Sequence, residues 1–206
     1  CFNLNVEEIN PTMQNLLCNY LSCQYLTMNF EIITTPDLNL RKLTPEVYTF
    51  VHTHYSDQQL SEFFGFSTRE EVIRSRARHS MGMSTYNRSF VNFQLLDKNT
   101  NKIIGGCGFH TWYLEHQRAE IGYDLRDDSY KRKGLMSQAM KAVLGYGFNV
   151  MELNRVEACI GPRNDASIAL VKKFGFVQEG YLREHYKKAE VIEDSLIFSL
   201  LRSEYL

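Results

Sequence analysis

Two hydrophobic periods meet near residue 130 of this 206-residue chain. Before that point, Ala119, Ile121, Tyr123 and Leu125 alternate with polar or small residues, which is the period-two pattern of a half-buried strand. After it, apolar residues recur at spacings of three and four over residues 134–150, as they do along one face of a helix. The pattern therefore predicts a strand, a turn and a helix in direct succession.

The turn between these two elements is basic and contains a glycine. Lys131, Arg132 and Lys133 precede Gly134, where the helical pattern begins. Backbone N–H groups at the start of a helix lack intrahelical acceptors, and the helix dipole adds partial positive charge there. Because glycine lets the backbone approach a ligand closely, the turn predicts a site for a pyrophosphate. A solvated basic turn that merely starts a helix is the alternative.

The other periodic segments predict a mixed α/β fold in which strands outnumber helices. Thr44, Pro45 and Glu46 form a helix-start signal. A polar turn over residues 97–101 joins two strand patterns into a hairpin. The expected strands are 38–43, 89–96, 102–113, 119–125, 155–160, 181–186 and 192–200, and the expected helices are 46–64, 68–83, 134–150 and 165–174.

The amino-terminal 30 residues are expected to be an extension, and residues 31–206 a single domain. An apolar stripe at helical spacing within the extension predicts an added amphipathic helix. The stripe consists of Met13, Leu16, Leu17, Tyr20, Leu21, Tyr25 and Met28. Packing of such a helix on the core is one expectation and partner binding is the other.

Composition indicates a cytoplasmic protein that binds neither nucleic acid nor a membrane. The formal net charge of -1 offers no general attraction to nucleic acid or to an anionic membrane surface. The five cysteines are an odd number without close metal-ligand pairs, which favours free thiols in a reducing compartment. A signal peptide begins with basic residues, whereas no Lys or Arg precedes Arg41. No apolar run approaches the length of a membrane span. No metal site is predicted.

Five segments of the carboxyl half follow one another in an informative order. They are AEIGYDL at 119–125, the basic turn with Gly134, LNRVEA at 153–158, NDAS at 164–167 and FGFVQEG at 174–180. Together they resemble the GNAT superfamily of acyl-CoA-dependent N-acetyltransferases and, within it, the ribosomal-protein (alanine/serine) N-terminal acetyltransferases, from about Thr34 to Leu201. The resemblance implies an α/β GNAT fold, with a mixed, mostly antiparallel sheet, a central splayed strand pair and flanking helices.

The resemblance also implies that acetyl-CoA binds at the basic turn. Two departures from the family pattern occur there: Lys131 replaces a glutamine or arginine, and Met136 replaces a small residue. Lysine keeps the charge but loses bidentate geometry, whereas neither change removes the backbone donors. Leu125 on the splayed strand marks the expected backbone oxyanion donors, and Asn164 is expected to hold the pantetheine amides. The expected cofactor-binding residues are Leu125, Lys131, Arg132, Lys133, Gly134, Leu135, Met136, Ser137 and Asn164.

Acetyl transfer to an amine requires a group that takes a proton from the amine and a group that protonates the thiolate. By resemblance, Glu120 matches the base of GNAT histone acetyltransferases, and Glu179 matches the proposed base of the ribosomal-protein group. The base is therefore Glu120, Glu179 or neither of them. The tyrosine acid of many GNAT enzymes is replaced by Val171. Ser167 is therefore the candidate acid, unless it only caps or packs the helix start.

The expected activity is direct transfer of acetyl from acetyl-CoA to a primary amine, above all the N-terminal α-amine of a protein such as a ribosomal protein. A small-molecule amine, either a polyamine or an aminoglycoside, is the first alternative. A non-catalytic acyl-CoA-binding regulatory module is the second, and the presence of both glutamates argues against it. The sequence leaves open whether the chain is a monomer or a homodimer.

Overall fold

The computed structural model describes residues 28–85 and 87–205, and it divides the chain into two units, residues 1–30 and 31–206. Apart from Met28, the predicted amphipathic stripe lies outside the described residues. The second unit contains the whole of the α/β architecture described below.

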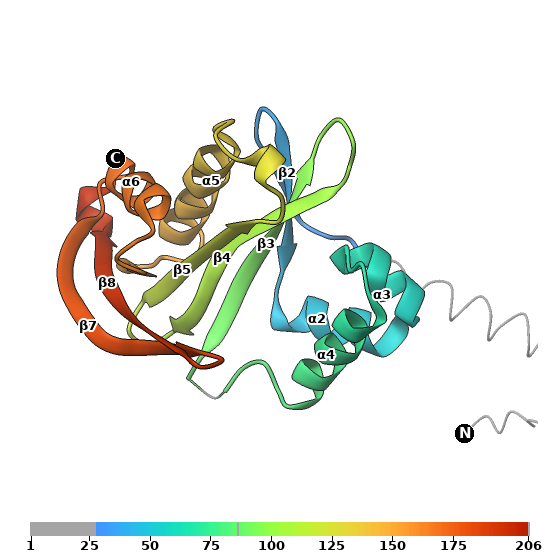
Figure 1. Cartoon of the computed structure of the whole chain (residues 1–206). Helices are drawn as coiled ribbons and strands as arrows, with labels where there is room; N and C mark the ends of the chain where they lie inside the picture. Colours follow the sequence, from blue (N-terminus) through green and yellow to red (C-terminus); the bar gives the residue numbers. More distant parts are fainter. Residues whose placement is uncertain (1–27, 86, 206) are drawn as a thin grey trace, which may run out of the picture. The chain divides into compact units, whose positions relative to one another are not determined.

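An eight-stranded sheet forms the centre of the second unit (Figure 1). Its strand order is β1-β2-β3-β4-β5-β6-β8-β7, and every neighbouring pair is antiparallel except β5 and β6. The mixed, mostly antiparallel sheet expected from the sequence is confirmed. The strands are β1 (Ile32–Thr34), β2 (Leu38–Leu43), β3 (Ser89–Asp97), β4 (Ile103–Tyr113), β5 (Arg118–Leu125), β6 (Arg155–Ile160), β7 (Val177–Lys188) and β8 (Val191–Leu201).

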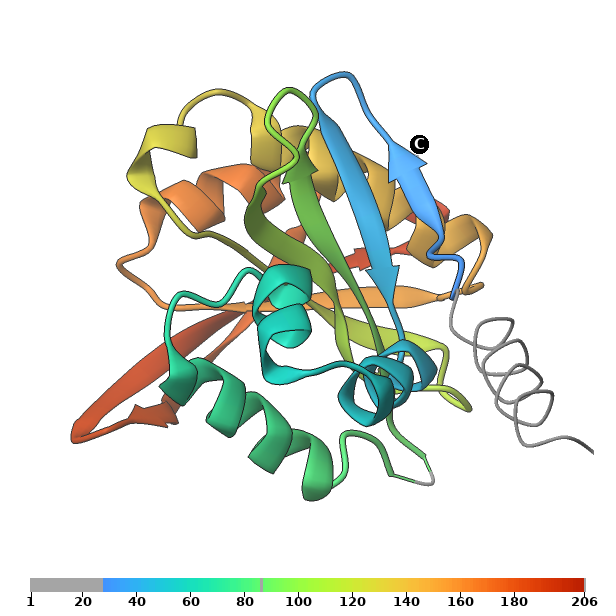
Figure 2. The same ribbon diagram turned by 90° about the vertical axis from the view of Figure 1, so that its right-hand side faces the viewer.

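The α-helices cover both faces of this sheet (Figure 2). One face carries α5 (Leu135–Asn149) and α6 (Asp165–Lys173), and the apolar stripe of α5 is buried in the main core. The other face carries α2 (Pro45–His54), α3 (Asp57–Phe64) and α4 (Arg69–Ser80). Among the described residues, no helix combines the length and apolar character needed to cross a membrane.

The helix predicted over residues 46–64 is wrong in one respect, because two helices occupy this range. Ser56 ends the continuity by capping α3: its side chain accepts a hydrogen bond from the Gln59 N–H, and the Gln59 side chain accepts from the Ser56 N–H. This reciprocal arrangement satisfies two donors that a continuous helix would use differently. Ser56 and Gln59 stand at the spacing of a capping box, so the break had a signal in the sequence.

The central strands β5 and β6 separate soon after they begin. Their parallel pairing covers only three positions and ends at Glu120 and Glu157, although β5 continues to Leu125. Beyond Glu120, the edge of β5 that faces β6 is therefore free of a strand partner. The central splayed pair expected from the resemblance is present.

The β7–β8 hairpin is longer than predicted and bends. Its register shifts between Leu182 and Tyr186, where Glu184 adopts a left-handed backbone with a φ of 53°. The Glu184 N–H donates to Asp194 Oδ1 on β8 over 2.7 Å, which holds the bend.

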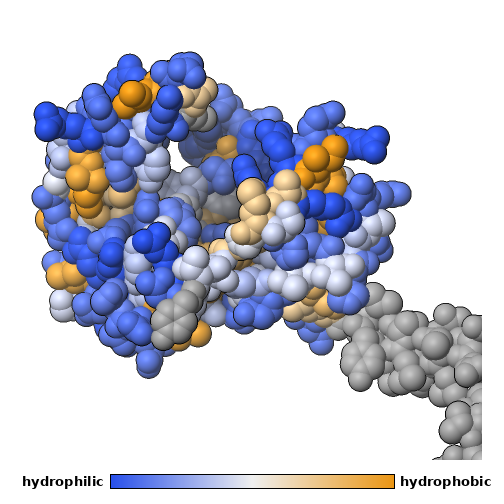
Figure 3. All heavy atoms as spheres, turned by 90° about the horizontal axis from the view of Figure 1, so that it is seen from below, coloured by the Kyte–Doolittle hydropathy of each residue, from blue (hydrophilic) through white to orange (hydrophobic). Residues whose placement is uncertain are grey.

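Seen from below, the second unit is hollowed between the β7–β8 side and the α2–α4 side, and most side chains on this surface are hydrophilic (Figure 3).

Candidate active site

A groove of about 680 Å³, which we call the α5–α6 groove, lies where the sequence predicts the cofactor. It is lined by residues 123–125 of β5, by the turn and the first helical residues of α5, and by one side of α6. All predicted cofactor-binding residues line it except Lys133. Tyr130 and Lys173 also line it, and neither is among the residues predicted from the sequence.

The basic turn presents backbone donors to this groove. Arg132 and Gly134 both adopt left-handed conformations, with φ values of 61° and 76°. Gly134 occupies the N-cap position of α5 and supplies no side-chain cap, so the N–H groups of the first helical turn remain available. Such a concave arrangement of N–H groups at a helix start, with Arg132 and Lys131 beside it, fits a pyrophosphate.

The opposite wall of the groove begins with Asn164, which is the N-cap of α6. Its Oδ1 accepts a hydrogen bond from the Ser167 N–H over 3.1 Å, so the side-chain amide retains its N–H donors for a ligand. Asn164, and not Ser167, is therefore the helix cap. For Ser167 this leaves the role of acid or of packing at the helix start. The Tyr123 hydroxyl donates to the Ser167 carbonyl over 3.4 Å and connects β5 to α6. Val171 is fully buried.

Leu125 has the orientation that an oxyanion donor on the splayed strand requires. The Arg126 N–H donates to the Ile104 carbonyl on β4 over 2.9 Å. Successive N–H groups of a strand point to opposite sides, so the Leu125 N–H points toward the side that β6 has left open. Leu125 also lines the α5–α6 groove.

A second hollow, of about 380 Å³, lies against β3, β4 and β5, and we call it the glycine pocket. Its floor contains Gly105, Gly106, Gly108 and Gly122, so side chains do not fill it. At Gly108 a Cβ atom would lie 2.5 Å from the Asn92 Cα, which only glycine avoids. The glycine pocket thus exists because glycines on neighbouring strands leave the space above the sheet unfilled.

The two hollows share two residues, Tyr123 and Asp124. Asp124 is exposed, but the atoms around its carboxylate remove part of its hydration and raise its pKa, and Arg126 opposes this effect. Within the described residues the Asp124 carboxylate makes no hydrogen bond or ion pair. In the sequence Asp124 is only a polar position of a strand pattern, because no local signal shows that it borders both hollows.

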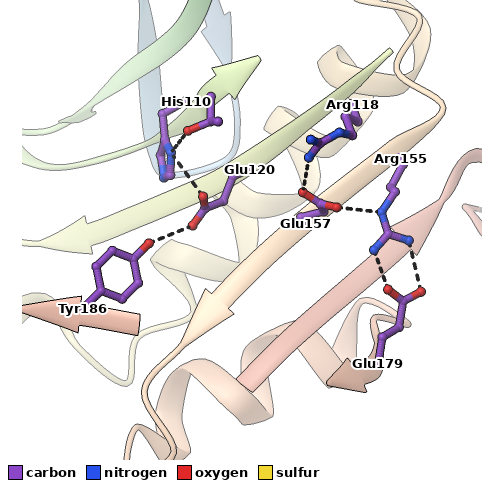
Figure 4. A network of polar contacts seen from close by, with 8 residues as sticks. His110, Arg118, Glu120, Arg155, Glu157, Glu179 and Tyr186 are labelled. Carbon is purple, nitrogen blue, oxygen red and sulfur yellow. Dashed lines mark hydrogen bonds and ion pairs between the residues drawn. The ribbon is translucent and has the colours of Figure 1, made fainter. Parts of the chain in front are cut away.

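Glu120 on β5 belongs to a small polar cluster with His110 on β4 and Tyr186 on β7 (Figure 4). The Tyr186 hydroxyl lies 3.4 Å from Glu120 Oε1, and His110 Nδ1 lies 3.7 Å from Oε2. His110 also lines the glycine pocket. Burial, followed by the charge of Glu120, raises the pKa of Tyr186 to about 12. Burial and Glu120 likewise raise the pKa of the Cys159 thiol to about 12, so both groups remain protonated beside this carboxylate at neutral pH.

Glu179 lies in a different cluster, shown beside the first in Figure 4. Arg155 on β6 holds both of its carboxylate oxygens, and the Ser199 hydroxyl donates to Oε1 over 2.7 Å. These contacts lower the pKa of Glu179 to about 2. Arg155 also donates to Glu157, which in turn accepts from Arg118. The structure therefore does not bring Glu120 and Glu179 together, and Glu179 lines neither hollow.

No group of three or more histidine, cysteine or acidic side chains suited to a metal ion occurs within residues 28–85 and 87–205.

Comparison with known proteins places these features in a family. The acetyltransferase (GNAT) domain model matches residues 37–177. The chain is 34% identical to "Uncharacterized N-acetyltransferase p20" of Bacillus licheniformis over 85% of this chain and 98% of that protein. It is 30% identical to "Putative ribosomal N-acetyltransferase YdaF" of Bacillus subtilis over 50% of this chain and 56% of that protein. It is 28% identical to the spermidine N(1)-acetyltransferase of Escherichia coli over 44% of this chain and 48% of that protein.

A solved structure agrees with the sequence relatives. The GNAT-family acetyltransferase from Bacillus anthracis superposes with a TM-score of 0.59 at 27% identity, covering 84% of this chain and all of that one. GNAT acetyltransferases take their acetyl group from acetyl-CoA, and the α5–α6 groove has the donors and the position to bind it. With the family model matching more than half of its residues, the chain belongs to the GNAT family of acetyltransferases.

Proposed function

We propose that this acetyltransferase modifies the N-terminal α-amine of a polypeptide. The observation that supports the proposal is the meeting of the two hollows at Tyr123 and Asp124. With acetyl-CoA in the α5–α6 groove, an amine that enters the glycine pocket from the other face of β5 reaches the thioester at this meeting point. The name of the relative YdaF and the resemblance to ribosomal-protein acetyltransferases agree with a protein substrate.

Acetyl-CoA supplies a thioester whose acyl carbon accepts the amine nitrogen, without a covalent bond to the enzyme. The basic turn would hold its pyrophosphate, and the Asn164 amide would donate to the pantetheine arm. The outward N–H of Leu125 would stabilise the charge that develops on the acyl oxygen.

Glu120 is proposed as the group that receives the proton released by the amine. Its carboxylate already accepts from Tyr186 and lies beside His110, which borders the glycine pocket. A water at the pocket wall would complete the path to Glu120. Glu179 fits this task less well, because Arg155 and Ser199 occupy its oxygens and its pKa is about 2. Ser167, or solvent, would protonate the departing thiolate, whose thiol has an ordinary pKa near 8.5.

Asp124 is proposed to hold the acceptor in its ammonium form before the proton leaves. Its carboxylate lacks a partner among the described residues and stands where the two hollows meet. A carboxylate in a partly desolvated position attracts a cation more strongly than one in bulk water. The ammonium proton would then pass to Glu120, and the neutral nitrogen would attack the acyl carbon of the thioester.

A polyamine is the second candidate acceptor. Asp124 would hold a polyamine ammonium as well as a peptide ammonium, and one relative is named a spermidine acetyltransferase. The positive charges of Arg74, Arg78 and Arg88, in hollows next to the glycine pocket, argue against this candidate. The cytoplasmic location expected from the sequence stays a prediction.

A CoA-release assay over a panel of amines tests the proposal. The panel contains a peptide with a free N-terminus and no lysine, the same peptide with a blocked N-terminus, spermidine and an aminoglycoside. The free peptide should be acetylated and its blocked twin should not. Turnover with spermidine or the aminoglycoside alone would show that the acceptor is a small molecule.

A further inference from the structure

One face of α4, near the glycine pocket on the acceptor side, carries two arginines that no hydrogen bond or ion pair holds in place among the described residues. Arg74 and Arg78, one helical turn apart, line a hollow of about 350 Å³ together with Tyr48, Phe66 and Met83. Both arginines are exposed, and neither makes an ion pair or a hydrogen bond within residues 28–85 and 87–205. We call this hollow the α4 pocket.

Other charged groups of α4 and its surroundings are already engaged. Arg76, on another face of the helix, forms an ion pair with Asp57 and donates to the His52 carbonyl. Among the described residues, Glu71 is the only acidic one that lines the α4 pocket, and its carboxylate accepts from the backbone N–H groups of Ser67 and Thr68. The charge of Arg74 also acts on this carboxylate, so two arginines stand against one glutamate. The charge that the pocket presents to a ligand is therefore positive.

The α4 pocket lies next to the glycine pocket, because Tyr48 lines both. Tyr48 and Arg78 both line the α4 pocket, where burial raises the pKa of Tyr48 and the Arg78 charge opposes that shift. A third arginine, Arg88, lines a neighbouring hollow that shares His110 with the glycine pocket. Arg88 lies over the ring of Tyr113 and makes no ion pair among the described residues.

The charges on the acceptor side thus have an order. Asp124 lines both the α5–α6 groove and the glycine pocket. Arg74, Arg78 and Arg88 line two other hollows, which share lining residues with the glycine pocket and none with the α5–α6 groove. Arg126, the other arginine of the glycine pocket, donates to the carbonyls of Phe64 and Gly65 and is fixed by them. A ligand that matches this order carries an ammonium at its end and anionic groups behind it.

We propose that the acceptor is a polypeptide whose first residues after the α-amine are acidic, and that Arg74 and Arg78 bind those carboxylates. The proposal rests on the proposed function and deepens it by naming the class of peptide. Guanidinium groups form charge-assisted hydrogen bonds with carboxylates, which supports recognition of aspartate or glutamate side chains.

The same arginines select against polyamines. Beyond its reacting amine a polyamine carries only further ammonium groups, which would lie near Arg74, Arg78 and Arg88. Discrimination by repulsion of the wrong ligand is as effective as attraction of the right one. Because the arginines are exposed, the effect should decrease as the ionic strength rises.

Three peptides with a common N-terminal serine and no other amine test the proposal. They carry aspartate, asparagine or methylated, permanently cationic lysine at positions two to four. At low salt, kcat/KM for the aspartate peptide should exceed that for the asparagine peptide by about tenfold, equivalent to about 1.4 kcal/mol. The difference should lie mainly in KM, because the arginines do not touch the reacting atoms. The cationic peptide should be the poorest substrate.

Two variants identify the residues responsible. The double change Arg74→Gln with Arg78→Gln should remove most of the preference for the aspartate peptide and leave the asparagine peptide unchanged. Arg69→Gln, on the same helix but outside the α4 pocket, should leave all three peptides unchanged. Circular dichroism and the melting temperature establish that each variant is folded.

The outcomes separate this inference from the proposed function. Equal rates with the aspartate and asparagine peptides would overturn the inference while leaving α-amine acetylation intact. An acidic preference that survives the double change would overturn the role of Arg74 and Arg78. If none of the three peptides is acetylated but spermidine is, the proposed function itself fails.

Discussion

Arg155 holds the carboxylate of Glu179 from the neighbouring part of the sheet, with Arg155 Nη1 3.0 Å from Glu179 Oε1 and Nη2 on the other oxygen. The Ser199 hydroxyl adds a third donor. A carboxylate held in this way is a weak base, because a proton must displace a guanidinium to bind. The contact joins β6 to β7 and thereby stabilises the bent hairpin on the rest of the sheet.

Glu179→Gln should consequently affect stability more than catalysis. The folded-state pKa of Glu179, about 2, lies below its unfolded value, so the ion pair stabilises the fold above pH 4.5 and this contribution is lost as the pH falls toward 2. Because the side chain is 41% exposed, we expect about 1 kcal/mol or less. Melting temperatures from pH 7 to pH 2 should show a deficit that shrinks in acid, with kcat nearly unchanged.

Glu193→Gln is the matched control for that experiment. Glu193 forms a loose, exposed ion pair with Arg163 at 4.0 Å and should show no comparable deficit. A loss of more than about a hundredfold in kcat for Glu179→Gln, with an unchanged melting temperature, would instead assign the catalytic base to Glu179.

Glu120→Gln should lower kcat by about 10²–10⁴-fold at neutral pH and leave the affinity for acetyl-CoA unchanged, because it removes the proton acceptor but keeps the size of the side chain. Tyr186→Phe should lower kcat much less, since its hydroxyl only donates to Glu120 over 3.4 Å. Steady-state kinetics with a saturating acceptor measure both. Equal and mild losses at Glu120 and Glu179 would mean that bulk water takes the proton.

Acetyl-CoA should raise the melting temperature of the protein through the basic turn. A ligand at about 100 times its dissociation constant adds about 2.7 kcal/mol to the free energy of unfolding. Arg132→Glu should reduce the shift strongly, whereas Lys133→Glu, which alters a residue outside the lining of the α5–α6 groove, should reduce it less. Thermal denaturation with and without ligand provides the measurement. If acetyl-CoA raises the melting temperature of the Arg132 variant as much as that of the wild type, the pyrophosphate does not bind at the basic turn.

The cofactor side could be predicted from the sequence because its signals are local. The change from period two to helical spacing places β5, the turn and α5, and Gly134 marks the point where the left-handed backbone occurs. The division of the helix predicted over residues 46–64 also has a local signal, because Ser56 and Gln59 form the capping box that starts α3.

The acceptor side could not be predicted, because it depends on contacts between distant segments. Tyr186 reaches Glu120 only because the β7–β8 hairpin bends at Glu184. The pairing of Glu179 with Arg155 depends on the order of strands at the edge of the sheet. Strand order and register are set by tertiary packing, for which a single sequence carries little local signal.

Asp124→Asn should stabilise the protein at neutral pH and weaken acceptor binding. Desolvation raises the folded-state pKa of Asp124, so its contribution to stability is present below the unfolded pKa near 3.9 and is lost as the pH rises through the folded value. The variant should therefore melt higher than the wild type at pH 7 and equally at pH 3. Its KM for the acceptor peptide should rise, with the affinity for acetyl-CoA little changed. A lower melting temperature at pH 7 would show that Asp124 has a structural partner.

The pH dependence of acceptor choice should favour the α-amine over a lysine side chain most strongly at neutral pH. An α-amino group titrates near 7.7–8.0 and a lysine near 10.4, so at pH 7 forming the neutral amine requires about 1.4 and about 4.6 kcal/mol respectively. A carboxylate base such as Glu120, in a site where Val171 replaces the tyrosine acid, is better matched to the smaller requirement. We expect a lysine-free peptide with a free N-terminus to react faster than an N-terminally blocked peptide with one lysine. The ratio of their kcat/KM values should narrow as the pH rises from 7 to 9, because more of the lysine then reacts as the neutral amine. A ratio that favours the lysine peptide at pH 7 would contradict the proposed acceptor.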